Sequence, residues 1–124
     1  MNSSLVSIIT PSFNSAKFIA ETIQSVQNQT YQNWEMIIVD DGSSDETESV
    51  VLSIIQNDNR IQFHKLNQNS GPAVARNTGI EKASGDYMTF IDADDIWFPT
   101  FIENNIKTIQ ETGIPFVFSS YKRA

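Results

Sequence analysis

The chain has 124 residues, which fits one domain, and it is 40% hydrophobic and 10% aromatic, so it can bury a core. Its formal net charge of −7 argues against a nucleic-acid partner, because binding phosphates needs a basic surface, and the lack of cysteine excludes disulfides and zinc–thiolate sites. The sequence has no basic signal region and no apolar run near the ~20 residues that span a bilayer. We therefore expect a cytoplasmic domain, peripheral to the inner face of the membrane in a full-length protein.

Apolar runs typical of buried strands alternate with segments of helical periodicity along the whole chain. The predicted elements, in chain order, are a strand over 5–10, a helix over 15–29, a strand over 36–39, a helix after a capping box at 43–46, a strand over 61–66, a helix over 72–83, a strand over 87–91, a helix from 99 to a stop at Gly113, and a strand over 116–120. The 61–66 strand has one more polar face, which predicts an edge position.

This alternation predicts an α/β fold with a Rossmann-like, mainly parallel sheet and helices on both faces. Right-handed crossovers place the carboxyl ends of the strands at one edge of such a sheet, and ligands bind beside that edge. The residues directly after each strand are therefore the candidates for function.

The first predicted strand is followed by Pro11, Phe13 and Asn14. Pro11 lacks an N–H and is expected to end the ladder, while Phe13 and Asn14 could offer a ring face and an amide to a ligand. An ordinary turn followed by a helix cap explains the same residues equally well.

Three carboxylates, Asp40, Asp41 and Asp45, follow the second predicted strand. Asp45 fits a helix N-terminus, where negative charge is favourable. Asp40 and Asp41 lie at the strand end, where adjacent charges repel unless a ligand or cation uses them, so function is the favoured interpretation there.

Asp92 and Asp94 follow the fourth predicted strand, and they point the same way if strand geometry persists. Two carboxylates on one side suit a hard divalent ion, whose other ligands are phosphate and water. A solvated acidic turn is the alternative, and it fits less well directly after an apolar strand.

Arg76 lies one turn into the helix that Pro72 opens, which makes an anion site or a surface ion pair with Glu81 equally reasonable.

His64, the only histidine, is expected to be structural or exposed. Trp34, Phe98 and Phe101 are expected in or over the core, and the place of Trp97 stays open.

These segments, taken together, resemble the family 2 glycosyltransferases of the GT-A fold. The matching segments are 7–14 (SIITPSFN), 37–45 (IIVDDGSSD), Asn69 and Gly71, 75–79 (ARNTG), 85–87 (GDY), and 92–95 (DADD) with Pro99. Their order and spacing, from about residue 6 to 99, carry the resemblance, since no single segment is specific.

The resemblance implies a site for a nucleoside-diphosphate sugar, most simply a UDP-sugar. Its nucleotide-binding residues would be Pro11, Phe13, Asn14, Asp41, Arg76 and Asp92. Asp92 and Asp94 would form the D-x-D pair, contacting the ribose and an Mn²⁺ or Mg²⁺ ion on the diphosphate. Phe13 stands where tyrosine is common in the family, so a hydroxyl contact is missing while the stacking face remains.

The implied activity is sugar transfer to a saccharide or lipid-linked acceptor in polysaccharide or glycoconjugate synthesis, with the metal stabilising the leaving diphosphate. Neither Glu103 nor Glu111 matches the motif of the family's catalytic base, so that base is expected beyond residue 124. Residues 1–124 are accordingly expected to form a single donor-binding domain at the N-terminal part of a longer glycosyltransferase. Its exposed sheet edge is expected to favour homo-oligomers.

Two other α/β classes and one inactive form compete with this interpretation. A phosphoacceptor receiver domain has similar length and an acidic pocket, but its acidic pair should follow the first strand. A sugar-nucleotide nucleotidyltransferase should have a glycine-rich basic loop after the first strand, and residues 11–17 contain no glycine. An inactive donor-binding remnant is also compatible with the sequence.

Overall fold

The computed structural model describes residues 4–113 and the backbone of 121–122. In chain order its elements are β1 (Val6–Ser12), α1 (Ile19–Gln27), β2 (Trp34–Asp40), α2 (Thr47–Ile55), β3 (Ile61–Lys65), α3 (Pro72–Lys82), β4 (Tyr87–Phe90), β5 (Asp95–Ile96), α4 (Phe101–Thr112) and β6 (Tyr121–Lys122). No helix in the described ranges is long and apolar enough to cross a bilayer.

Four parallel strands form the main sheet, in the order β3-β2-β1-β4. The central strands β1 and β2 are buried along almost their whole length, as their nearly continuous apolar sequences predict. β3 lies at one edge, which confirms the edge position predicted from its more polar face. β5 and β6 form a separate antiparallel pair.

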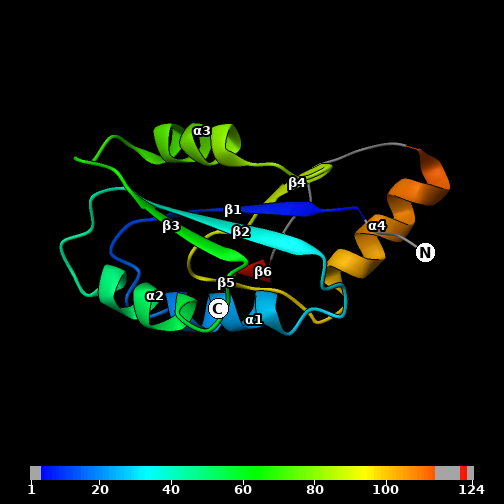
Figure 1. Cartoon of the computed structure of the whole chain (residues 1–124), viewed down its shortest axis with the longest axis horizontal. Coiled ribbons are helices and arrows are strands. Elements are labelled where there is room, and N and C mark those ends of the chain that lie inside the picture. The colour runs from blue at the N-terminus through cyan, green and yellow to red at the C-terminus, as the bar shows by residue number, and fades with distance from the viewer. Residues whose placement is uncertain (1–3, 114–120, 123–124) are drawn as a thin grey trace.

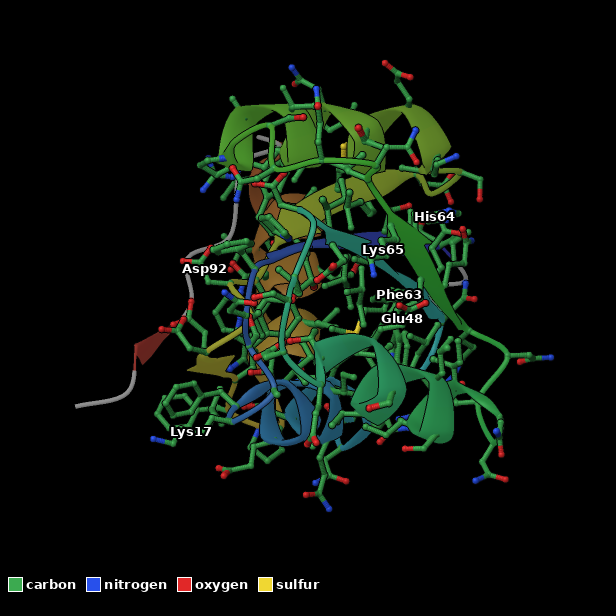
Figure 2. All side chains as sticks on the ribbon, turned by 90° about the vertical axis from the view of Figure 1, so that its left-hand side faces the viewer. Lys17, Glu48, Phe63, His64, Lys65 and Asp92 are labelled. Atoms are coloured by element: carbon green, nitrogen blue, oxygen red, sulfur yellow. The ribbon has the colours of Figure 1, made fainter. Side chains whose placement is uncertain are left out.

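Helices cover both faces of the sheet, as predicted (Figure 1). α3 lies on one face over a small apolar cluster that includes Ile37, Val39 and Ala75. α1 and α2 lie on the other face, over a larger cluster to which α4 contributes Ile102 and Ile106. Figure 2, an end view of the sheet, shows the same three layers, with Asp92 and His64 on opposite sides of the molecule.

Close packing of α3 on the sheet depends on Gly79. A Cβ atom at this position would lie 2.5 Å from Cγ2 of Ile9, a fully buried side chain of β1. Because carbon atoms do not approach so closely, only glycine allows this helix to lie at its present distance.

Pro11 does not end the β1 ladder, and the prediction that it would is wrong. β1 continues through Pro11, paired with Val39, to Ser12, paired with Asp40. The backbone N–H and C=O groups of even-numbered residues in β1 point toward β2, as when the amide of Val6 donates to the carbonyl of Asn33. Those of odd-numbered residues point toward β4, as when the carbonyl of Ile9 accepts the amide of Ile91. The missing N–H therefore faces the side where β4 has already ended, so it costs the β2 ladder nothing.

The predicted capping box at Ser43 and Glu46 does not form. Glu46 is itself the N-cap of α2, without a side-chain cap hydrogen bond, and Ser43 Oγ donates to Asp40 Oδ1 at 2.5 Å. α1 begins only at Ile19 rather than at Ser15, after a turn in which the Ser15 carbonyl accepts the amides of Phe18 and Ile19.

The other predicted elements lie within a few residues of the observed ones. Gly113 ends α4 in the left-handed conformation, with φ of 71°, as predicted. The strand predicted over 116–120 lies outside the described residues.

Candidate functional site

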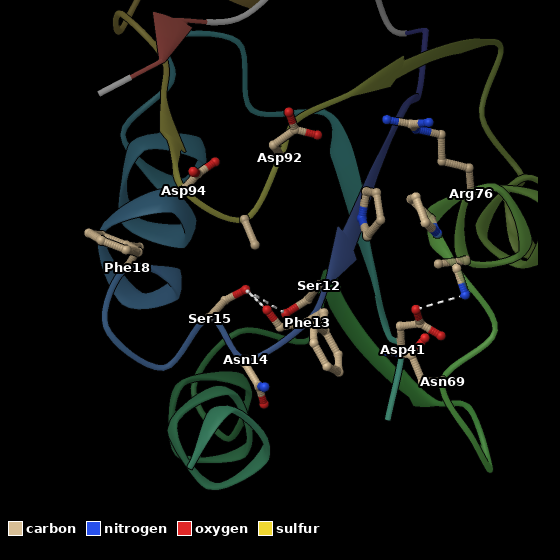
Figure 3. Close-up of a pocket in the computed structure, with 15 residues that line it drawn as sticks. Ser12, Phe13, Asn14, Ser15, Phe18, Asp41, Asn69, Arg76, Asp92 and Asp94 are labelled. Carbon is tan, nitrogen blue, oxygen red and sulfur yellow. Dashed lines mark hydrogen bonds between the residues drawn. The ribbon is translucent and has the colours of Figure 1, made fainter. Parts of the chain in front are cut away.

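A pocket of about 540 Å³ lies at the carboxyl end of the sheet, where the sequence predicts the site (Figure 3). Its walls come from the turn after β1, the residue after β2, the start of α3 and the turn after β4. The lining residues are Pro11, Ser12, Phe13, Asn14, Ser15, Phe18, Asp41, Asn69, Gly71, Pro72, Ala75, Arg76, Asp92, Ala93 and Asp94. The structure thus brings together every residue that the resemblance assigns to nucleotide or metal.

Asp41 follows β2 directly and is only 5% exposed. Its two carboxylate oxygens accept the amide hydrogens of Ser70, at 2.7 Å, and Gly71, at 3.0 Å, so Asp41 holds the loop before α3. Figure 3 shows Asp41 at the pocket with the second of these bonds dashed. Each carboxylate oxygen has two lone pairs, so both can still accept an N–H from a ligand in the pocket. This loop-holding role was missed in the sequence, because the partners are about 30 residues away.

Gly42 makes room for the same loop. Its φ of 79° lies in the left-handed region, and a Cβ there would lie 3.0 Å from the backbone nitrogen of Asn69. Glycine is therefore needed for both the backbone conformation and the close approach.

The aromatic part of the wall consists of Phe13 and Phe18, whose side chains are 49% and 40% exposed. An exposed ring at a pocket offers a face on which a planar or sugar ring can stack. Phe18 was not singled out in the sequence, because it directly precedes the apolar stripe of α1 and is indistinguishable from a core residue there.

Asn14 joins the turn after β1 to the turn after β2. It has a positive φ of 49°, which asparagine tolerates, and its side-chain oxygen accepts the amides of Ser44 at 2.9 Å and Asp45 at 3.3 Å. Its own amide donates to Ser43 Oγ at 2.7 Å. Asn14 lines the pocket, but its amide oxygen is used mainly within the chain.

The remaining carboxylates of the second strand end are structural. Asp40 is fully buried and does not line the pocket; its carboxylate accepts the amide and hydroxyl of Ser43. The functional interpretation of Asp40 is therefore wrong. Asp45 accepts the amide of Thr47 in the first turn of α2, and the hydroxyl of Thr47 lowers the pKa of the Asp45 carboxyl.

Asp92 and Asp94 lie in a turn rather than in a continued strand. β4 ends at Phe90, and the amide of Asp95 donates to the carbonyl of Asp92 at 3.0 Å, which closes the turn. The expected strand alternation is therefore wrong. The carboxylates of Asp92, Asp94 and Asp95 nonetheless each offer an oxygen within 4.8 Å of the others.

These three carboxylates fit a hard divalent cation by their chemistry. Mg²⁺ and similar ions take oxygen ligands, typically one or two carboxylates with phosphate and water for the rest. Asp92 and Asp94 line the pocket, and Asp95 belongs to the same cluster but is buried and does not line the pocket. Asp95 is not among the predicted ligands because in a continued strand its side chain would point away from those of Asp92 and Asp94.

Arg76 lies across the pocket from the acidic turn, on α3 (Figure 3). Its side chain is exposed, and no salt bridge joins it to Glu81 within the part of the chain that the structure describes. The surface ion pair considered from the sequence is therefore absent there, and the guanidinium is available to an anion in the pocket.

The pocket is lined neither by the residues discounted in the sequence nor by Trp97, whose place stays open there. Trp97 is buried and stacks on Phe101, with ring centroids 4.6 Å apart, and Trp34 is buried beneath the guanidinium of Arg60. His64 lies on the edge strand β3, where burial and then the charge of Lys82 lower its pKa (Figure 2).

The comparisons with known proteins agree with this geometry. Residues 7–123 match the family model described as glycosyl transferase family 2. The chain is 43% identical over 117 residues to the putative teichuronic acid biosynthesis glycosyltransferase TuaG of Bacillus subtilis, covering 94% of this chain and 46% of that protein. It spans about half or less of the length of the curated relatives it matches first.

Solved structures show the same fold. S. aureus TarS 1–349 in complex with UDP-GlcNAc superimposes with a TM-score of 0.82 at 31% identity, over 87% of this chain and 32% of that one. The mannosyltransferase PcManGT of Pyrobaculum calidifontis, in complex with GDP-Man and Mn²⁺, gives a TM-score of 0.82 at 26% identity, over 88% and 33%. These matches set aside the receiver and nucleotidyltransferase alternatives, and the chain belongs to glycosyl transferase family 2, with the GT-A fold.

Proposed function

We propose that the pocket binds the nucleoside diphosphate of a sugar donor, most simply a UDP-sugar, through a divalent cation. The observation that carries this proposal is the division of one pocket into two chemically different sides. Asp41 and Phe13 lie on one side, and the carboxylates of Asp92 and Asp94 lie on the other (Figure 3). A nucleoside diphosphate has the same division, with a planar base at one end and an anionic diphosphate at the other.

On the base side, the exposed ring of Phe13 would stack on the base, and Asp41 would accept a base N–H. Because two loop amides already fix the Asp41 carboxylate, its acceptor lone pairs are held in place before the nucleotide arrives. Pro11 and Asn14 would complete this side by shaping the turn that carries Phe13.

On the diphosphate side, the negative turn would repel phosphate until a cation lies between them. Asp92 and Asp94 would hold Mn²⁺ or Mg²⁺, with Asp92 also reaching the ribose, and Arg76 would contact the diphosphate from the opposite wall. The cation would stabilise the charge of the leaving diphosphate during transfer. The UDP-GlcNAc in the complex of TarS, and the GDP-Man and Mn²⁺ in the complex of PcManGT, support this proposal.

We place this donor site in a longer glycosyltransferase that transfers the sugar to a saccharide or lipid-linked acceptor. The teichuronic acid biosynthesis in the name of TuaG supports a polysaccharide product. Transfer also needs a base that deprotonates the acceptor hydroxyl. Each carboxylate that lines the pocket has a proposed nucleotide or metal role, so we assign no catalytic base among the residues that the structure describes.

Calorimetric titrations of the chain with UDP, GDP and AMP, each with and without Mn²⁺, test this function. We expect UDP to bind with Mn²⁺-dependent affinity and AMP, which has no diphosphate, to bind much more weakly. Equal binding of all three nucleotides in Mn²⁺, or no binding of any, would refute a site for a nucleoside diphosphate.

A further inference from the structure

Helix α1 presents a row of buried polar side chains to the segment that carries the acidic turn. Thr22 and Ser25, which are 0% and 7% exposed, lie three residues apart on one face of α1, and Gln29, which is 1% exposed, follows just beyond the end of the helix at Gln27. Their hydrogen-bond partners include main-chain groups between residues 93 and 102, about 70 positions away in sequence.

The bonds nearest the site belong to Thr22. Its Oγ1 lies 2.9 Å from the carbonyl oxygen of Ala93 and 2.7 Å from that of Asp95, so one hydroxyl hydrogen is shared between the two. Further along, the amide of Trp97 donates to Ser25 Oγ at 3.2 Å.

Gln29 continues the row away from the site. Its side-chain nitrogen donates to the carbonyl of Phe98 at 2.6 Å, and its side-chain oxygen accepts the amide of Ile102 at 3.0 Å. Thr22 and Ser25 on α1, together with Gln29 just after it, thus hold the backbone of this segment from the acidic turn to the start of α4.

The two carbonyls that Thr22 bonds flank Asp94 in sequence. Between them, the amide of Asp95 bonds the carbonyl of Asp92, so the turn is fixed both within itself and from α1. Thr22 is fully buried and cannot reach a cation, so its influence passes through the backbone. Groups that hold metal ligands in orientation commonly change metal affinity when they are removed.

We propose that Thr22 is a positioning residue for the metal site: its hydroxyl fixes the 92–95 turn so that Asp92 and Asp94 present their carboxylates together. The metal half of this inference rests on the proposed function. The turn-fixing half does not, because it concerns the backbone of the metal-free chain.

Thr89 provides a matched control. It is also a fully buried threonine, on β4, but its hydroxyl has no hydrogen-bond partner among the described residues. Thr22→Ala and Thr89→Ala remove the same atoms from equally buried places, and only the first removes hydrogen bonds to the turn. Thr22→Ser keeps the hydroxyl and removes the methyl group.

The test is an NMR titration with Mn²⁺ alone, in which paramagnetic broadening of the amide signals of residues 92–95 gives an apparent Kd. Hydrogen exchange of the Asp95 amide is measured in the metal-free chain with the same variants. We expect Thr22→Ala to raise the Kd about 10-fold or more and to speed exchange, Thr22→Ser to restore both, and Thr89→Ala to change neither. If Thr22→Ala does not fold, Thr22→Val, which fills the space, replaces it.

Equal Kd values for Thr22→Ala and Thr89→Ala would overturn the inference. A failure of Thr22→Ser to restore Mn²⁺ binding would also overturn it, because loss of the methyl group would then explain the weaker binding of Thr22→Ala. Absence of Mn²⁺ binding in the parent chain would instead refute the proposed function. In that case the metal-free exchange rates still decide whether Thr22 fixes the turn.

Discussion

Replacing Asp41 by asparagine is expected to destabilise the chain and to weaken nucleoside binding at the same time. The carboxylate accepts the amides of Ser70 and Gly71 at 2.7 and 3.0 Å, and it is 5% exposed, so water cannot replace a lost partner easily. Asparagine retains one acceptor oxygen and turns an NH₂ group toward the other amide. A hydrogen bond to a charged group contributes about 1.5–3 kcal/mol, so we expect a loss of about 2 kcal/mol.

In urea, a loss of this size lowers the unfolding midpoint by about 1 M, because the slope for small proteins is about 1–3 kcal/mol per M. Asp94→Asn is the matched control: it removes the same charge from an exposed carboxylate and should leave the midpoint nearly unchanged. Uridine binding without metal, measured by calorimetry, should weaken in Asp41→Asn and not in Asp94→Asn. Equal midpoints and equal uridine affinities in the two variants would refute the role assigned to Asp41.

Three further predictions concern packing, acid stability and transfer. Gly79→Ala should lower the free energy of unfolding, measured in urea, by about 1–3 kcal/mol, because its Cβ would lie 2.5 Å from Ile9 Cγ2. Asn77→Ala, on the exposed side of the same helix, should leave that free energy unchanged, and equal effects of the two substitutions would show that α3 can shift at no cost. Hydrogen bonds from Arg60 lower the pKa of Asp58 to about 2. The ionised Asp58 therefore adds about 2 kcal/mol to the free energy of unfolding above pH 4, and this contribution is lost as the pH falls from about 4 to 2. Asp58→Asn should remove the fall of the free energy of unfolding between pH 4 and 2, whereas Glu48→Gln, which breaks an exposed pair with Lys65, should keep it. The same dependence of this free energy on pH in both variants would contradict the role of Asp58. Finally, the chain should show no sugar transfer to an acceptor, and acceptor-dependent turnover would show that the catalytic base lies within residues 1–124. Sedimentation velocity of this 13.9 kDa chain should reveal self-association, and a strictly monomeric species would remove the argument from the sheet edge.

The sheet and the place of the site could be predicted from the sequence because both depend on local patterns. Buried parallel strands are continuous apolar runs, as in β1 and β2, and the ends of such strands meet at one edge. Acidic and amide side chains at the ends of those runs are therefore predicted to share a pocket. The structure places Asn14, Asp41, Asp92 and Asp94 there, but not Asp40 or Asp45.

What the sequence could not predict are the contacts made across long separations. Asn14, rather than Ser43, accepts the amides ahead of α2, and Asp41 accepts amides from the loop before α3. Local spacing carries no information on such partners. The row on α1 left a faint signal, since Thr22 and Ser25 adjoin the apolar stripe of that helix, but their partners could be identified only from the structure.

The central claim is that a cation held by the acidic turn carries the diphosphate of the donor. Its most direct test is the ratio of UDP affinities with and without Mn²⁺, measured by calorimetry in the parent chain, in Asp94→Asn and in Glu111→Gln. Glu111 supplies the charge control because it is exposed, near the end of α4, and does not line the pocket. We expect Mn²⁺ to strengthen UDP binding in the parent and in Glu111→Gln, and to have no effect in Asp94→Asn, whose metal-free uridine affinity stays at the parent value. An equal response to Mn²⁺ in all three proteins would contradict the account.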